Sequence, residues 1–215
     1  MRAQDSDMNI ERLTVGPFQA SCYVVWGLER HALVIDPGAD AQVIRACLDA
    51  HGLDAAVYLL THGHMDHISA LADISAKHPA PYAMHALDLK WAFGALNQSP
   101  PYYSVPRRPG SALRTLADGQ TWTDGGLAYT VIGTPGHSPG SVCFHFQDDH
   151  VIFSGDTLFQ GTVGRTDLPG GDGRVLTQSL RKLAQLPPAT RILPGHGPET
   201  RLSDELRTNP FLKRP

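Results

Sequence analysis

Short, largely apolar runs separated by glycine, proline and charged residues dominate the first part of the chain. The runs contain four to six residues and are rich in valine, isoleucine and aromatic side chains, a composition that is typical of strands. They predict strands at residues 10–15, 22–26, 32–35, 55–60 and 81–84. Because the run at 55–60 is apolar without a break, we expect that strand to be covered on both faces of its sheet.

Other apolar residues in this part recur at the spacing of an α-helix. Those between 43 and 48 share one face of a predicted helix, with Asp40 as its N-cap and Gly52 as its end. A second helix is expected from Asp66 to about Lys77, and a third over 86–93. The alternation of strands and helices indicates a sheet that is flanked by helices.

The second part of the chain opens with a proline-rich stretch. Residues 97–110 contain four prolines, a density that excludes regular secondary structure, so we expect a loop there. That loop would form either a wall or lid of a substrate site or a plain surface connection. The elements expected after it are strands at 127–132, 142–146, 151–153 and 191–193, a glycine-rich loop at 161–173 and a helix over 175–183.

Composition and charge set limits on the class of protein. The chain has 215 residues, of which 41% are hydrophobic, and no linker divides it, so we expect one domain over 1–215 with a disordered extension at 1–7. A formal net charge of −3 without a large basic cluster argues against a nucleic-acid partner. No run is long enough to span a membrane, and three widely spaced cysteines fit reduced thiols in a cytoplasmic protein. The oligomeric state stays open.

Three imidazoles and one carboxylate fall within six residues, directly after the predicted strand at 55–60. His62 and His64 should point to the same side because they are two residues apart at a strand end. Asp66 and His67, at the start of the next helix, should face the same point. Imidazole nitrogen and carboxylate oxygen are the ligands that divalent metals take in catalytic sites. A histidine-rich surface loop is the competing interpretation, but this spacing after a buried strand favours a metal site.

Three further ligand-type residues occur later in the same context, each after an apolar strand and a turn that contains glycine or proline. They are His137, Asp156 and His196. One such residue alone is usually a solvated turn residue, whereas four matching contexts indicate one shared site. One metal position would take His62, His64 and His137, and the other Asp66, His67 and His196. Asp156 would bridge the two metals, and a hydroxide between them would complete a two-metal hydrolytic site.

These seven residues resemble the signature of the metallo-β-lactamase superfamily. The family motif His-x-His-x-Asp-His stands at 62–67, and the later ligands follow in the family's order. The resemblance implies an α+β fold, an αββα sandwich of two mixed sheets flanked by helices. The stretches 155–159, 164–167 and 194–198 are most similar to short glyoxalase II-like hydrolases, which are thioesterases related to hydroxyacylglutathione hydrolase. Too few residues follow His196 for the C-terminal helical domain of the full-length enzymes, which supplies part of the glutathione site.

The resemblance implies a metal-dependent hydrolase of small-molecule thioesters, with S-lactoylglutathione or a related acyl thioester as substrate. It also implies two divalent ions, zinc in the first place and iron or manganese as alternatives. Asp66 would hold its metal and orient the attacking hydroxide. Arg165 stands nine residues after Asp156, where the full-length enzymes carry a lysine that binds a glutathione carboxylate, so we expect it to bind substrate. Internal pairing of Arg165 with Asp167 is the alternative.

Other functions are compatible with parts of this pattern. Persulfide dioxygenases of the superfamily use one iron, for which His62, His137 and Asp156 form a two-histidine, one-carboxylate set. Lactamase activity is less favoured because Asp156 stands where many lactamases carry cysteine. The nucleases of this fold generally add an inserted domain and a basic surface, neither of which is visible. A metal-stabilised binding module ranks last, because structural zinc sites are closed and often use cysteine.

Overall fold

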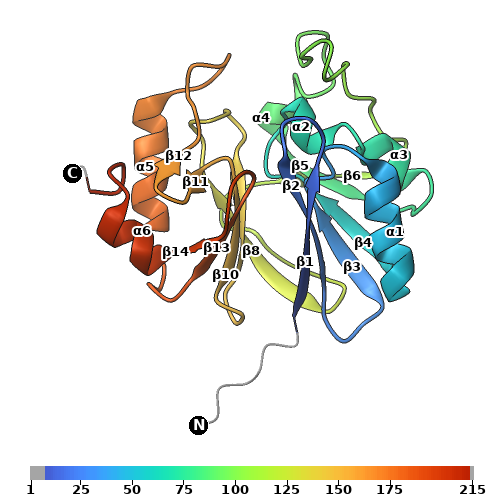
Figure 1. Cartoon of the computed structure of the whole chain (residues 1–215), viewed down its shortest axis with the longest axis horizontal. Coiled ribbons are helices and arrows are strands. Elements are labelled where there is room, and N and C mark those ends of the chain that lie inside the picture. Colours follow the sequence, from blue (N-terminus) through green and yellow to red (C-terminus); the bar gives the residue numbers. More distant parts are fainter. Residues whose placement is uncertain (1–7, 214–215) are drawn as a thin grey trace.

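The computed structural model describes residues 8–213, so the extension expected at 1–7 lies outside the described residues. Two six-stranded sheets pack face to face, and helices cover both outer faces (Figure 1). The first sheet consists, in spatial order, of β1 (Asn9–Val15), β2 (Ala20–Trp26), β3 (His31–Ile35), β4 (Asp54–Leu59), β5 (Tyr82–His85) and β6 (Leu113–Leu116). Strands β3 to β6 are parallel to one another, whereas β1, β2 and β3 are antiparallel.

The second sheet is also mixed, because β10 and β13 are parallel and its other neighbours are antiparallel. Its strands, in spatial order, are β14 (Thr200–Arg201), β13 (Arg191–Pro194), β10 (Val151–Gly155), β9 (Val142–Phe146), β8 (Leu127–Gly133) and β7 (Thr121–Asp124). A small hairpin of β11 (Leu158–Phe159) and β12 (Thr162–Val163) lies beside it. The αββα sandwich expected from the sequence is therefore confirmed.

Helices complete the two outer layers. The outer face of the first sheet packs against α1 (Ala41–His51), α2 (Met65–Ile68) and α3 (Leu71–Ser75), and α4 (Ala86–Leu89) follows β5. The outer face of the second sheet packs against α5 (Gly173–Leu183) and α6 (Leu202–Thr208). Within residues 8–213, none of these helices has the length and apolar character needed to cross a membrane.

The alternation of side chains along the strands explains why the two sheets stack. In β8, Leu127, Tyr129 and Val131 point into the core between the sheets, as the period of two in a strand requires. In β4, Val57 enters this same inter-sheet core, whereas Tyr58 packs among the residues under α1 and α3. The continuous apolar run at 55–60 is therefore covered on both faces, as expected.

Two sequence expectations about helices were wrong in detail. The helix expected from Asp66 to about Lys77 is broken into α2 and α3, because the Ala70 N–H donates to the Pro37 carbonyl at 3.0 Å and not to the preceding turn. The helix expected over 86–93 ends at Leu89 as α4. Asp40 is the N-cap residue of α1, as expected, but its carboxylate accepts the Gly16 N–H at 2.8 Å and makes no hydrogen bond to the helix. The sequence patterns also missed β6, β7, β11, β14, α6 and β12, the last of which lies inside the glycine-rich loop expected at 161–173.

Candidate metal centre

The segments that follow β4, β8, β10 and β13 meet at one edge of the sandwich, and each carries ligand-type residues. Two backbone hydrogen bonds join the sheets at this edge: Val142 N–H donates to the Thr61 carbonyl at 2.8 Å, and Ser21 N–H to the Gly195 carbonyl at 2.7 Å. In chain order the seven residues are His62 and His64 in the β4–α2 loop, Asp66 and His67 in α2, His137 in the β8–β9 loop, Asp156 after β10 and His196 after β13.

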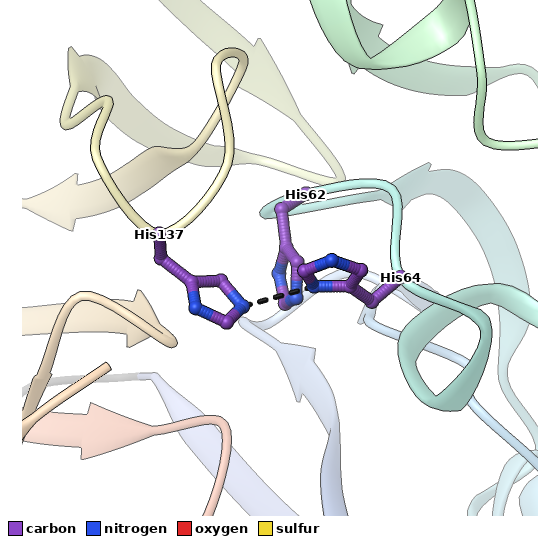
Figure 2. A group of neighbouring side chains, drawn as sticks. All are labelled: His62, His64 and His137. Carbon is purple, nitrogen blue, oxygen red and sulfur yellow. Dashed lines mark hydrogen bonds between the residues drawn. The ribbon is translucent and has the colours of Figure 1, made fainter. Parts of the chain in front are cut away.

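Three histidines form the first group. The ligand atoms of His62, His64 and His137 lie within 4.8 Å of one another. Figure 2 shows the three rings pointing toward a common point, with His64 Nδ1 2.9 Å from His137 Nε2. Two of them are almost fully buried, since His62 is 1% and His137 2% exposed. The rings meet edge to face, with centroids 4.7–4.9 Å apart.

Asp66, His67 and His196 form the second group, and their ligand atoms also lie within 4.8 Å of one another. His196 Nε2 is 3.3 Å from Asp66 Oδ2 and 3.3 Å from His67 Nε2. The second group is more open than the first, because 28% of the His196 side chain is exposed whereas His67 is fully buried.

The Asp156 carboxylate lies between the two groups. Its Oδ1 is 3.5 Å from His67 Nε2, and its Oδ2 is 3.6 Å from His137 Nε2 and 3.7 Å from His196 Nε2. A single side chain therefore faces both groups, which is the placement a bridging carboxylate needs. Gly195 makes room for it, since a Cβ at that position would lie 2.2 Å from Asp156 Oδ1.

These residues fit a bound divalent metal. His62 Nε2 and Asp156 Oδ1 are buried and have no hydrogen-bond partner among the described residues, an arrangement that costs free energy unless something satisfies them. A cation between the two groups would pair with both atoms. The set of imidazole nitrogens and carboxylate oxygens, without sulfur, is of the type that zinc and iron accept in catalytic sites.

Comparison with known proteins agrees with this geometry. The sequence model of the metallo-beta-lactamase superfamily matches residues 15–196, most of the chain. The chain belongs to the metallo-β-lactamase superfamily. The hydroxyacylglutathione hydrolase GloC of Haemophilus influenzae is 34% identical, over 95% of this chain and 98% of the relative.

Two solved structures are also similar to this chain over nearly its full length. The B3 metallo-beta-lactamase BLEG-1 is 35% identical with a TM-score of 0.88, covering 96% of this chain and 100% of that chain. TTHA1623, solved in a di-iron-bound form, is 39% identical with a TM-score of 0.84, covering 94% and 100%. This chain is thus a metallo-β-lactamase-fold protein with metal-binding histidine and aspartate groups.

A buried aspartate, Asp36 at the end of β3, orients histidines of both groups. Its Oδ2 accepts the Thr61 hydroxyl at 2.6 Å, so the Thr61 oxygen is left to accept the His62 Nδ1–H at 3.0 Å. The same Oδ2 accepts the His67 Nδ1–H at 3.0 Å. Both rings are therefore held with Nε2 directed at the metal positions, as ligating histidines require.

A second buried aspartate, Asp88 in α4, joins the two loops that carry the first group. It accepts the Gly63 N–H at 2.8 Å, from the loop of His62 and His64. From the His137 loop it accepts the Ser138 hydroxyl and the Gly140 N–H, both at 2.6 Å. Burial raises the pKa of Asp88, although these three donors oppose the shift. No local sequence pattern identifies Asp88, because its role depends on the meeting of two loops whose His64 and His137 are 73 residues apart.

The two groups differ in their affinity for protons. Burial, followed by the neighbouring imidazoles, lowers the pKa of His62 well below its usual range and that of His64 to about 4. Burial also lowers the pKa of His67, but the carboxylates of Asp156, Asp66 and Asp36 outweigh it and raise the value to about 10. Burial and the neighbouring imidazoles therefore keep His62 and His64 neutral at pH 7, whereas His67 in the second group holds a proton when no metal is bound.

Arg165 lies in the wall of the cavity over the metal centre, which has a volume of about 630 Å³. Its backbone carbonyl accepts the His137 Nδ1–H at 2.8 Å, which fixes that ring. Its guanidinium makes two hydrogen bonds of 2.7 Å to the exposed Asp167 carboxylate. The internal pairing considered as an alternative is therefore present, and substrate binding by Arg165 stays a prediction. The loop at 97–110 contributes Gln98 and Ser99 to the same wall.

Proposed function

We propose that this protein is a metal-dependent thioester hydrolase that cleaves S-lactoylglutathione or a related acyl thioester with two bound zinc ions. The observation that carries the proposal is the Asp156 carboxylate, which faces a three-histidine group on one side and His67 and His196 on the other. The resemblance to GloC, a hydroxyacylglutathione hydrolase over almost the same length, supports the thioester class. Iron or manganese in place of zinc would leave the assignment of residues unchanged.

Each group of residues has a defined task in this reaction. When bound, the metals supply an activated water and a Lewis acid for the carbonyl oxygen. Asp66 is ionised, because His67 and His196 hold its pKa well below the usual range even though burial raises it. Its carboxylate can therefore accept a hydrogen bond from the attacking water and orient it. The departing thiol has a pKa of about 8.5, so the thiolate can leave without a dedicated general acid.

The assay that tests this proposal uses protein reconstituted with zinc and purified free of other metals. We expect hydrolysis of S-lactoylglutathione, followed at the thioester absorbance, and little hydrolysis of a β-lactam. The β-lactam is included because BLEG-1, a B3 metallo-beta-lactamase, is 35% identical. Turnover of the β-lactam with no hydrolysis of any thioester would contradict the proposal.

Oxygen-dependent chemistry is the second candidate, and the di-iron-bound form of TTHA1623, at 39% identity, favours iron as the metal. In that case His62, His137 and Asp156 would hold a single iron that oxidises glutathione persulfide, as in mononuclear iron oxygenases. Such a site would leave Asp66, His67 and His196 without a metal. Their ligand atoms nevertheless lie within 4.8 Å of one another, as those of the three histidines do. Oxygen uptake by the iron-loaded protein on glutathione persulfide would identify this activity.

A further inference from the structure

A second cavity, of about 590 Å³, lies directly beside the metal centre. It shares four wall residues with the cavity over the metals: His64, Met65, Gln98 and Leu168. A ligand held at the metals can therefore extend into this second cavity without leaving the protein surface. We call it the side pocket. Its volume is in the range of pockets that hold small-molecule ligands.

The walls of the side pocket are mainly apolar. Trp91 forms one side; its ring centroid is 5.1 Å from that of His64, and its ring carbons would lie about 3.1 Å from a Cβ on Gly63. Leu96 stands at the pocket and is 96% exposed, so its apolar side chain is available to contact a ligand there. The remaining apolar wall consists of Pro139, Leu168 and Pro169.

Polar groups contribute little to this pocket. The buried Asn97 side chain already donates to the Gly63 and Ala92 carbonyls, at 2.8 and 2.5 Å, and accepts the Met65 N–H at 3.1 Å. Among the residues of the described chain that line the pocket, Lys90 is the one with a charged side chain outside the metal centre, and it is exposed to solvent. An occupant must therefore gain its affinity from burying apolar surface.

We infer that the side pocket binds the acyl group of the substrate, and that this group is apolar and longer than lactoyl. The inference rests on the proposed function. The carbonyl carbon is trigonal, so the acyl chain and the thiol carrier leave the metals in different directions. Arg165 and Thr162 line the cavity over the metals together with Phe18 and Phe159, so that cavity offers polar groups that the side pocket lacks. We therefore place the polar carrier there and the acyl chain in the apolar pocket beside His64.

The first experiment measures kcat/KM of the zinc-loaded protein on acetyl, butyryl, hexanoyl and octanoyl thioesters of glutathione. Each methylene that enters an apolar site should raise kcat/KM by up to about fourfold, which corresponds to about 0.8 kcal/mol. From butyryl to octanoyl we expect a rise of about ten- to a hundredfold, because part of the chain will stay in contact with water. A flat or falling series would overturn the inference.

Substitution of Leu96 tests the location of the acyl chain. Leu96→Asp places a charge where the chain would pass, so the ratio of octanoyl to acetyl kcat/KM should fall about tenfold or more, whereas Leu96→Met should retain the ratio. Leu28→Asp is the matched control, since Leu28 is another exposed leucine, at 86%, and does not line the pocket. An equal fall in the ratio for Leu28→Asp, or none for Leu96→Asp, would overturn the assignment.

A binding measurement separates this inference from the proposed function. Calorimetry of the zinc-loaded protein should give tighter binding for octanoate than for butyrate, and Leu96→Asp should remove the difference. If this holds while no thioester is hydrolysed, the pocket assignment stands and the thioesterase proposal fails. If thioesters are hydrolysed with no effect of chain length, the thioesterase proposal stands and the pocket assignment fails. Dimerisation that Leu96→Asp abolishes, together with a flat series, would assign the pocket to a second copy of the chain and overturn the inference.

Discussion

The two halves of the metal centre are built on different principles. The first group consists of three imidazoles, two of them almost fully buried, and burial together with the neighbouring imidazoles lowers the pKa of His62 and of His64. The second group contains the Asp66 carboxylate and the partly exposed His196, and the surrounding carboxylates raise the pKa of His67 to about 10. The first is therefore ready to accept a cation, whereas the second must exchange a proton for it.

The supporting aspartates differ in the same way. Asp88 holds two backbone loops and touches none of the ligand side chains, so it sets the distance between His62, His64 and His137. Asp36 acts on the rings themselves, on His67 directly and on His62 through Thr61. The second position therefore depends on the ring orientation and charge that Asp36 provides at His67. The first depends on the loop positions that Asp88 sets and, at His62, on Asp36 through Thr61.

Removal of the carboxylate that joins the halves should have the largest effect. Asp156→Ala takes a ligand from both metal positions, whereas His196→Ala takes one from the second position alone. We expect Asp156→Ala to lower the metal content at both positions. It should also lower kcat/KM on the order of a thousandfold, more than the roughly 10- to 100-fold that follows when a residue hydrogen-bonded to a metal ligand is lost. Elemental analysis and turnover measure both. Two retained metals with near-normal activity would refute the bridging role.

Substitution of the supporting aspartates should distinguish the halves. Asp88→Asn should weaken the first metal position by about 10- to 100-fold and lower the free energy of unfolding by about 2–3 kcal/mol, because its donors lose their charged acceptor. Asp36→Asn should weaken chiefly the second position through His67. The control is the exposed Asp54→Asn, which should change neither. Competitive zinc titration measures each affinity, and an identical loss at both positions in both variants would contradict the distinction.

As the pH falls, metal affinity should weaken at the second position before it weakens at the first. Because the pKa of His67 is raised to about 10, it is protonated at every lower pH when no metal is bound, and a metal must displace that proton. Affinity at the second position should fall about tenfold per unit as pH falls from 9 to 7. At the first position it should stay constant there, since the pKa of His64 is about 4. Zinc affinities measured at pH 9, 8 and 7 test this, and parallel curves would contradict it.

Arg165 should give the smallest effect. Its exposed guanidinium is already paired with Asp167, so a substrate carboxylate must compete for it. Arg165→Ala should raise KM for a glutathione thioester by about three- to tenfold with little change in kcat. Asp167→Asn frees the guanidinium and should lower KM or leave it unchanged. A fall mainly in kcat for Arg165→Ala would mean that the side chain does not bind substrate. Its role would then be to order the loop whose Arg165 carbonyl accepts the His137 Nδ1–H.

The elements that the sequence predicted well are those whose signal is local. Apolar runs ended by glycine or proline turns located β3, β4, β8, β10 and β13, and the ligand-type residues at their ends do meet in the structure. By contrast, β6 and β7 are four-residue strands with mostly exposed or half-buried side chains, so they lack a clear hydrophobic period. The break between α2 and α3 comes from a hydrogen bond to Pro37, a contact that exists only in the fold.

The supporting residues could be predicted less well than the ligand-type residues. Asp36 follows an apolar strand in an Asp-Pro-Gly turn, the same context as the ligand-type residues, and this signal could have identified it. Asp88 and Asn97 had no such signal, because each acts by binding backbone groups of distant segments. Their roles follow from tertiary contacts, which a hydrophobic pattern does not encode.

The central claim is that the two groups form one centre with two metals that share Asp156. Its most direct test is a zinc titration of metal-free protein, with the number of bound equivalents counted by calorimetry and elemental analysis at pH 8. We expect two equivalents of zinc per chain in the wild type, and the loss of both high-affinity zinc sites in Asp156→Ala. A single equivalent in the wild type, or one tightly held iron with oxygen uptake on glutathione persulfide, would contradict it.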